Sequence, residues 1–274
     1  MPKFPGLQRS KERNVKSNRF SDRVALVTGG GSGMGAAIAL RLAEEGATVV
    51  VSGRDTEKLS RTVDQAPEGS TIVQRVVDVR NEAAVVELVD GTAEAFGRLD
   101  VLVNCAGASD IGLLAGLDKQ TWQDIIAVNA GAVLYTAKAA IPHLERTRGN
   151  IVNVGSSNAL HSNYGQPAYG AAKSAAESLS ASIAIEYGAK GIRSNTVHPG
   201  VIYPTGMTGF MGDIPGTVEA YSAHIPMRRM GTPEEIAAVV AFLASSEASY
   251  VNGAAITVDG GLNRVMHLPP TVSV

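Results

Sequence analysis

Short apolar runs alternate with amphipathic stretches along most of the chain. The first run, Val24–Val27, leads through a glycine-rich turn into a helical pattern over 36–45 that ends before Gly46. The next run, over 48–52, is rich in β-branched residues and does not alternate, as expected of a strand covered on both faces. The chain is therefore predicted to open with a strand, a turn, a helix and a second, buried strand.

The same alternation continues to residue 258. Further strands are expected over 71–77, 99–104, 150–154, 193–198 and 254–258, and further helices over 82–96, 121–140, 168–187 and 233–244. Strands that alternate with helices form a parallel sheet, and right-handed crossovers place the helices on both of its faces. The expected fold class is α/β, a Rossmann-like doubly wound sheet of about seven strands, in one domain over residues 22–264.

The two ends of the chain lack this pattern. Residues 1–20 contain six basic residues and one acid, without the apolar run that a secretory signal requires. We interpret residues 1–21 as a flexible basic tail, with a targeting segment or a subunit-docking arm as the alternatives. Residues 265–274 are expected to form a C-terminal tail.

Composition narrows the class of protein. A net charge of −2 provides no domain-wide basic surface for a nucleic acid, and no apolar run reaches the length of a membrane helix. We expect a soluble protein without either partner. The only cysteine, Cys105, excludes an intrachain disulfide and a cysteine-cluster metal site and suits a cytoplasmic location. The five histidines show no ligand spacing, so no metal is expected.

The turn after the first strand is the first candidate site. It reads Thr28-Gly-Gly-Gly-Ser-Gly-Met-Gly35. Glycine clusters also mark ordinary tight turns, but here the missing side chains let a pyrophosphate reach backbone N–H groups at the positive end of a helix. The turn therefore predicts a dinucleotide cofactor, with contacts from Gly29, Ser32, Gly33, Met34 and Gly35.

The end of the second strand bears on which dinucleotide binds. An NAD enzyme usually places an acid there to accept hydrogen bonds from the ribose hydroxyls, and Gly53 stands in its place. The neighbouring Arg54 offers a planar, permanently charged group that can bind a 2′-phosphate. We expect NADP(H). NAD(H) is the alternative if Arg54 is only a solvated loop residue or if Asp55 turns toward the ribose.

Tyr169 and Lys173 form the second candidate site. They are four residues apart in a predicted helix, so their side chains lie on the same face. A nearby ammonium favours the phenolate and is expected to lower the pKa of the tyrosine from its ordinary value of about 10. Such pairs also occur by chance in helices, and further motifs are needed to support a catalytic interpretation.

Taken together, the motifs resemble those of the short-chain dehydrogenase/reductase family over about residues 22–262. The glycine spacing, the segment Asn104-Cys-Ala-Gly107 and the pair Asp78-Val79 carry the resemblance beside Tyr169 and Lys173. The family pattern assigns the carbonyl-oxygen partner to Ser156, 13 residues before Tyr169, and leaves its neighbour Ser157 a supporting role.

The resemblance implies further residue roles. Asn129 would hold a water that relays protons to Lys173, which would also bind the nicotinamide ribose. The cofactor contacts that it implies are Asp78, Val79, Asn104, Ala106, Gly107, Tyr169, Lys173, Pro199, Gly200 and Ile202. Pro204 stands where the family commonly has threonine, and Thr205 is a weak candidate for that phosphate contact.

The implied activity is hydride transfer between nicotinamide and a carbonyl or secondary alcohol, with Tyr169 as the acid and base, in a homotetramer. A non-catalytic dinucleotide-binding protein and lyase or epimerase chemistry are the alternatives. The residue types fit a small oxygenated ketone or alcohol, a sugar-like polyol, or a flat terpenoid or steroid.

The substrate side of the site is expected on loops. The pocket residues expected from the family's geometry are Ser109, Asn158, His161, Tyr164 and Gln166. The glycine-rich segment 205–225 is predicted to form a mobile lid. Its apolar residues Met207, Phe210 and Met211 form either one wall of the pocket or ordinary packing.

Overall fold

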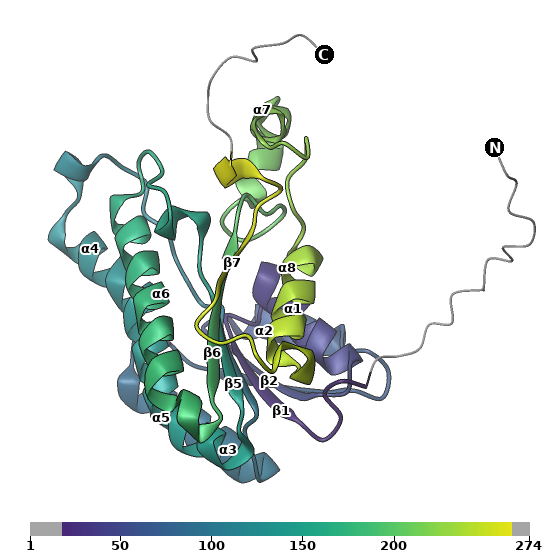
Figure 1. Cartoon of the computed structure of the whole chain (residues 1–274). Coiled ribbons are helices and arrows are strands. Elements are labelled where there is room, and N and C mark those ends of the chain that lie inside the picture. Colours follow the sequence, from purple (N-terminus) through teal and green to yellow (C-terminus); the bar gives the residue numbers. More distant parts are fainter. Residues whose placement is uncertain (1–17, 265–274) are drawn as a thin grey trace, which may run out of the picture.

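A computed structural model describes residues 18–264 (Figure 1). Its centre is a seven-stranded sheet with the order β3-β2-β1-β4-β5-β6-β7, and every neighbouring pair is parallel. The strands are β1 (Val24–Thr28), β2 (Thr48–Gly53), β3 (Thr71–Val76), β4 (Val101–Asn104), β5 (Asn150–Val154), β6 (Arg193–Pro199) and β7 (Ala255–Val258). The strand order reverses between β1 and β4, which is where ligands bind in such sheets. The Rossmann-like fold expected from the sequence is confirmed.

Helices cover both faces of the sheet (Figure 1). On one face lie α1 (Gly33–Glu44), α2 (Thr56–Asp64) and α8 (Pro233–Ala244). On the other lie α3 (Glu82–Phe96), α4 (Lys119–Ile126), α5 (Ala132–Thr147) and α6 (Pro167–Tyr187). The short helix α7 (Thr217–His224) belongs to the segment between β6 and α8, beyond the carboxyl end of β6.

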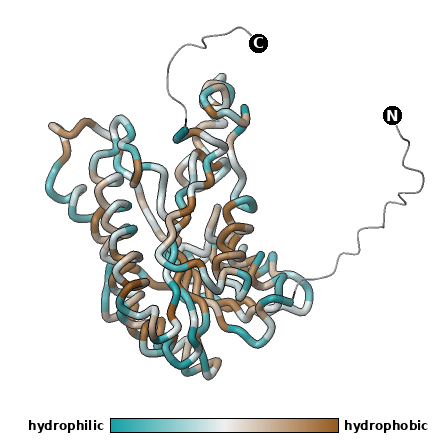
Figure 2. Tube along the Cα trace, viewed as in Figure 1, coloured by the Kyte–Doolittle hydropathy of each residue, from teal (hydrophilic) through white to brown (hydrophobic). Residues whose placement is uncertain are grey.

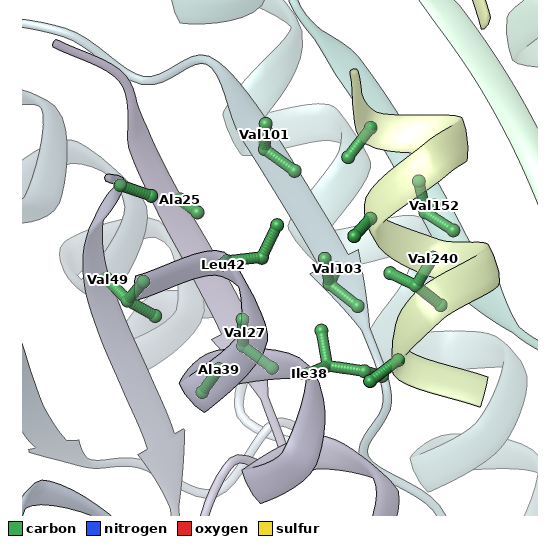
Figure 3. Packing of buried hydrophobic residues seen from close by; sticks show 14 of the residues in the cluster. Ala25, Val27, Ile38, Ala39, Leu42, Val49, Val101, Val103, Val152 and Val240 are labelled. Carbon is green, nitrogen blue, oxygen red and sulfur yellow. The ribbon is translucent and has the colours of Figure 1, made fainter. Parts of the chain in front are cut away.

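Two apolar clusters hold the sheet between these helices. On one face, Leu42 of α1 and Val240 of α8 pack over Val103 of β4 (Figure 3). On the other, Leu144 of α5 packs with Leu102 of β4. Figure 2 shows the apolar positions gathered along the strands and the inner faces of the helices. Burial on both faces explains why the strands read as continuous apolar runs.

Three elements differ from the sequence-based expectation. Helix α2 was not anticipated because it buries only Leu59 and Thr62 and most of its other residues are polar. The helix expected over 121–140 is two helices, α4 and α5, joined by a π-helical turn at Ala127–Gly131. The segment 205–225 contains the 3₁₀ turn Gly209–Asp213 and α7, where only an irregular stretch was expected.

The domain begins earlier than expected. Phe20, assigned above to the tail, is fully buried in the core cluster, and its N–H donates to the carbonyl oxygen of Glu45 over 2.9 Å. The Arg19 guanidinium forms ion pairs with Glu45 at 2.6 Å and with Glu247 at 2.9 Å. Residues 18–21 are therefore part of the folded domain. The rest of the expected N-terminal tail and the expected C-terminal tail lie outside the described residues.

One helical stretch, Lys119–Thr147, is long and apolar enough to cross a membrane by length and composition, with 44% of its most apolar window buried in the fold. It contains α4, the π-helical turn and α5. Its α5 part packs against β4, α3 and α6 through the buried residues Ala137, Ala140 and Leu144. Its apolar character is thus accounted for by core packing.

Candidate active site

The glycine turn is shaped by two close approaches of the backbone. Gly29 has a φ of 69°, and a Cβ there would lie 2.8 Å from Cα of Ala106. A Cβ on Gly35 would collide with the carbonyl group of Gly29. The N-cap of α1, Ser32, makes no capping hydrogen bond with its side chain. The first N–H groups of α1 are therefore available to an anion, as the dinucleotide prediction requires.

An open cavity of about 560 Å³ extends from this turn toward the end of β2. Its lining residues are Gly29, Gly31, Ser32, Gly53, Arg54, Asp55, Lys58 and Leu59. The cavity thus carries two cationic side chains and one acid. Lys58 was missed by the sequence analysis because helix α2 was not anticipated; the signal was Asp55 followed by a short polar helical stretch.

The acid in this cavity is already engaged. The Asp55 carboxylate caps α2 by accepting the N–H of Lys58 over 3.0 Å, and its other oxygen lies 3.5 Å from Nζ of Lys58. The backbone hydrogen bond from Lys58 lowers the pKa of Asp55 below its usual value. Arg54 is exposed and pairs with no acid among residues 18–264. The guanidinium is therefore free to meet a ligand.

The predicted adenine-side acid, Asp78, follows β3. Arg80 binds its carboxylate, with Nη2 and Oδ2 2.6 Å apart, and reaches Asp124 of α4 over 3.1 Å. The Arg80 guanidinium lowers the pKa of Asp78. Val79 is buried. Arg80, which the sequence analysis did not single out, fixes the orientation of Asp78.

The predicted catalytic residues come from three segments that meet beyond the carboxyl ends of β4 and β5. Ser156 follows β5, and its Oγ accepts the N–H of Asn158 over 3.2 Å, which leaves its O–H free to donate. Tyr169 and Lys173 lie one turn apart on α6, with Nζ of the lysine 5.7 Å from the centre of the phenol ring. Nζ also donates to the carbonyl oxygen of Val154 over 2.9 Å.

Burial is the main influence on the pKa values of Tyr169 and Lys173. Burial raises the pKa of Tyr169, and the neighbouring Ser156 side chain acts in the opposite direction. Burial lowers the pKa of Lys173 to about 8. The expectation that Lys173 lowers the pKa of Tyr169 is therefore wrong, because both groups lie in a water-poor interior that disfavours their charged forms.

Asn129 occupies the π-helical turn and is buried. Its Nδ2 donates to the carbonyl oxygens of Ala108 and Ile125 over 2.8 and 2.9 Å, whereas its Oδ1 has no partner among the described residues. A Cβ on Gly107 would lie 2.8 Å from that Oδ1 and 3.5 Å from Nζ of Lys173. A buried acceptor beside Lys173, under a glycine that leaves room, fits the water-relay role that the resemblance implied.

Other predicted cofactor residues line the same edge of the sheet. The N–H groups of Cys105 and Ala106 donate to Oγ1 of Thr28 over 3.1 and 3.2 Å, which holds the loop after β4 against β1. The side chain of Asn104 is turned inward, with its Nδ2 donating to Oδ1 of Asn153 over 2.9 Å. Its part is therefore to support this loop, and a cofactor contact would come from its main chain.

The turn after β6 holds the last predicted contacts. A Cβ on Gly200 would lie 2.7 Å from Cβ of Asp259, so the turn packs tightly behind Pro199. Ile202 is buried and forms a bridge with Gly231. The turn is thereby anchored to the segment that leads into α8.

Three of the predicted pocket residues are brought together. Gln166 donates to Oγ of Ser109 over 2.7 Å and accepts from Nδ2 of Asn158 over 2.7 Å. His161 and Tyr164 are exposed and make no hydrogen bond to these three side chains. Loops after β4 and β5 are therefore joined to the start of the catalytic helix by Gln166.

Asp110 is a site residue that the sequence analysis missed. Its buried carboxylate accepts the N–H groups of Ala168 and Tyr169 over 3.2 and 3.0 Å. It thus satisfies the open N-terminus of α6 and fixes the backbone that carries the phenol. The sequence signal for this residue was only an acid shortly after the Asn-x-Ala-Gly segment. It did not indicate a capping role, because no helix begins next to it in the sequence.

The predicted lid lies over the cofactor side of the site. Cβ of Thr205 lies 3.3 Å from where a Cβ of Gly33 would stand, and Cε of Met207 lies 3.8 Å from the corresponding point on Gly107. Phe210 is half exposed, whereas Met211 is buried in a small cluster with Ile225 and Met230. Met211 therefore packs the segment against the chain that follows it, and its part in a pocket wall stays a prediction.

Residues 29–263 match the family described as Enoyl-(Acyl carrier protein) reductase. The chain is 37% identical over 243 residues to meso-2,3-butanediol dehydrogenase of Serratia marcescens, covering 89% of this chain and 95% of that one. It is 37% identical over 247 residues to 3-oxoacyl-[acyl-carrier-protein] reductase FabG of Thermotoga maritima, covering 89% and 99%. The crystal structure of gox2181 superposes with a TM-score of 0.86 at 34% identity, covering 90% and 98%.

The expected family is thus confirmed by relatives that span nearly the whole of both chains. The names of these relatives describe reactions of alcohols or carbonyl groups. The chain belongs to the short-chain dehydrogenase/reductase family, and it is an oxidoreductase that acts on alcohol or carbonyl substrates.

Proposed function

We propose that this enzyme transfers hydride between NADP(H) and a ketone or secondary alcohol, with Tyr169 as the general acid and base. One observation carries the proposal. Arg54 and Lys58 line the cavity next to the glycine turn, while Ser156, Tyr169 and Lys173 lie beyond the carboxyl ends of β4 and β5. The site thus offers a cationic end for a phosphate and a proton-transfer end for chemistry.

The residues present fit a bound dinucleotide. The glycine turn excludes side chains where a pyrophosphate would approach α1, and the buried Oδ1 of Asn129, beside Lys173, has no hydrogen-bond partner within residues 18–264. When bound, the nicotinamide supplies or accepts the hydride. Gly29, Gly33 and Gly35 would hold the pyrophosphate through backbone N–H groups.

The proton moves on the chain's own groups. Because burial raises the pKa of Tyr169, the phenol is protonated at neutral pH and can donate its proton to a developing alkoxide. The Ser156 hydroxyl, free to donate, stabilises the same oxygen; one preorganised donor of this kind contributes about 2.7–4 kcal/mol. In oxidation the same two groups act in reverse.

Lys173 lies next to the phenol of Tyr169 and can pass protons to it. Its pKa of about 8 leaves it mostly protonated at neutral pH, yet close enough to titration to exchange protons. The Oδ1 of Asn129 lies beside it and would accept a hydrogen bond from a water between them. We infer that this water path resupplies the proton that Tyr169 donates.

Selectivity for NADP(H) is inferred from the charges near β2. The carboxylate that would favour NAD(H), Asp55, caps α2 and faces Lys58. Arg54 forms no ion pair with an acid among the described residues. A 2′-phosphate would therefore meet two cations, and the charge of Asp55 would be offset by Lys58.

A turnover screen tests the proposal. The purified chain would be mixed with NADPH or NADH and a panel containing a hydroxyketone, a 3-oxoacyl thioester, a polyol-derived ketone and a steroid ketone, and nicotinamide absorbance would be followed. Turnover with NADPH that disappears in Tyr169→Phe supports the proposal. Tyr135→Phe, on α5, is the matched control and should keep activity. Turnover that survives Tyr169→Phe rejects the acid/base assignment.

We also propose a homo-oligomer, a tetramer, located in the cytoplasm. This rests on the family resemblance and on the single cysteine, Cys105, which is free. Light scattering during size-exclusion chromatography measures the mass directly against the 28.4 kDa of one chain. A monomeric mass at micromolar concentration contradicts the proposed assembly.

A further inference from the structure

His198 is a fully buried titratable residue that the mechanism above does not use. It lies in β6, directly before the Pro199-Gly200 turn, and its imidazole reaches the backbone of Ser156. Nδ1 accepts the N–H of Ser156 over 3.1 Å. A ring nitrogen that accepts a hydrogen bond carries no proton, so the single proton of the neutral imidazole lies on Nε2.

Glu177 stands on the other side of this ring. Its Oε2 lies 3.0 Å from Nε2, although the N–H is not aligned for a full hydrogen bond. Glu177 is on α6, one turn after Lys173, and its side chain is 31% exposed. The carboxylate can therefore rotate toward Nε2, whereas the fully enclosed imidazole cannot turn away.

The space for the ring is made by Gly155. A Cβ on this residue would lie 2.5 Å from Nδ1 and 2.7 Å from Cε1 of His198. The N–H of Gly155 donates to the carbonyl oxygen of Val197 over 2.7 Å, which continues the pairing of β5 with β6. The backbone that leads into Ser156 is thus held by β6 through one backbone bond and one imidazole bond.

We propose that His198 is a positioning residue for Ser156, and that Glu177 selects the imidazole tautomer that does this. The proposal deepens the function proposed above and rests on it. Nδ1 fixes the N–H of Ser156, and the Oγ of the same residue must point at the reacting oxygen. A packing role alone would need neither an acceptor toward Ser156 nor a carboxylate beside Nε2.

Protonation of the ring would break this arrangement. With a proton on both nitrogens, Nδ1–H would face the N–H of Ser156, and two donors repel each other. Burial and the charge of Lys173 lower the pKa of His198, and Glu177 opposes them. Within the described part of the chain, these two α6 side chains and the Ser156 backbone are the charged and polar groups that act on the ring.

Three variants test the role. His198→Asn can place Oδ1 where Nδ1 lies and keep the acceptor for Ser156, while His198→Leu has a similar size and no acceptor. We expect His198→Leu to lower kcat about tenfold or more with the KM for NADPH changed less than about twofold, since an unpaired buried N–H is costly. His198→Asn should retain most of the wild-type kcat.

The pH profile separates positioning from packing. The wild-type kcat should fall on the acid side, below the ordinary pKa of histidine of about 6.5, as the ring becomes protonated. His198→Asn should lose this acid limb. Glu177→Gln should move it to lower pH, because removing the carboxylate charge makes the imidazolium less stable. Equal acid limbs in all three proteins would overturn the proposal.

A measurement without substrate keeps the two proposals distinguishable. Nitrogen-15 NMR of the histidine rings, with His198→Asn for assignment, should show Nδ1 of His198 unprotonated at neutral pH. A protonated Nδ1 would refute the positioning role whether or not turnover is found. If wild-type protein turns over no substrate while Nδ1 is unprotonated, the proposed function fails and the tautomer assignment stands. If His198→Leu does not fold, His198→Asn and Glu177→Gln carry the kinetic test.

Discussion

Changing the cations beside β2 should change which nicotinamide cofactor the enzyme prefers. Arg54 and Lys58 line one cavity, and a side chain at Gly53 would meet Leu59 at 3.6 Å, an ordinary contact. A charge-assisted hydrogen bond contributes about 1.5–3 kcal/mol. Since 1.4 kcal/mol is tenfold, Arg54→Gln should raise the KM for NADPH about 10- to 150-fold. The KM for NADH should change little.

The reverse substitution introduces the missing acid. Gly53→Asp should weaken NADPH through repulsion of the 2′-phosphate and should strengthen NADH by accepting hydrogen bonds from the ribose. Gly53→Asn is the matched control, since it adds the same volume without the charge. Lys58→Gln should raise the KM for NADPH less than Arg54→Gln, because its ammonium is already beside Asp55.

Steady-state kinetics with both cofactors, at low and high salt, measures these effects. The loss caused by Arg54→Gln should shrink as salt screens the charges, since the Arg54 guanidinium is exposed. Equal losses for NADPH and NADH in Arg54→Gln would refute the reasoning, because a group that binds only the 2′-phosphate cannot affect NADH. A wild-type preference for NADH would refute it as well.

Three further predictions concern stability and the catalytic helix. Lys173→Met should stabilise the cofactor-free protein at pH 7 by up to about 3 kcal/mol in urea unfolding, because the pKa of Lys173 falls from 10.5 to about 8 on folding. In the wild type the destabilisation from burying the Lys173 ammonium is lost as pH rises from about 8 to 10.5, so the free energy of unfolding should increase over that range relative to Lys173→Met. A difference between the two proteins that does not change over this range contradicts the lowered pKa of Lys173. Phe20→Ala should cost about 3–5 kcal/mol in the same assay, whereas Arg23→Ala, at a partly exposed position, should cost less; similar losses would show that residues 18–21 are peripheral. Asp110→Asn should lower kcat and the thermal midpoint together, because the asparagine amide cannot accept both N–H groups of α6. Asp118→Asn, at the N-cap of α4, is the control and should affect stability alone.

Local signals predicted much of the fold. Helices α3 and α8 were predicted with the bounds that the structure shows, because both ends carry residues that stop or start a helix, such as Gly97 and Pro233. The strand over 150–154 was predicted from its β-branched residues, and the structure buries all five of its positions, including Asn150 and Asn153. The catalytic residues followed from spacing within one helix and from the family pattern.

What the sequence did not predict depends on contacts between distant segments. Phe20 becomes part of the core only because it meets the end of α1, and helix α2 is stabilised by its packing on β2 and β3 more than by its own polar sequence. The contact between His198 and Ser156 joins residues 42 positions apart. The hydrophobic periodicity of the sequence cannot predict this contact, because the contact depends on the order of the strands in the sheet.

The π-helical turn between α4 and α5 changes the direction in which the two halves of one continuous helical stretch present their side chains. A regular helix has a fixed angular relation between its ends, and the wider turn changes this relation between α4, which packs on α6, and α5, which packs on α3. Removing one residue within Ala127–Gly131 would restore the regular winding and rotate the two halves by about 100° relative to each other. Such a shortened protein would gain helical regularity and lose the alignment of its reaction centre, which makes this turn a place where stability and turnover compete.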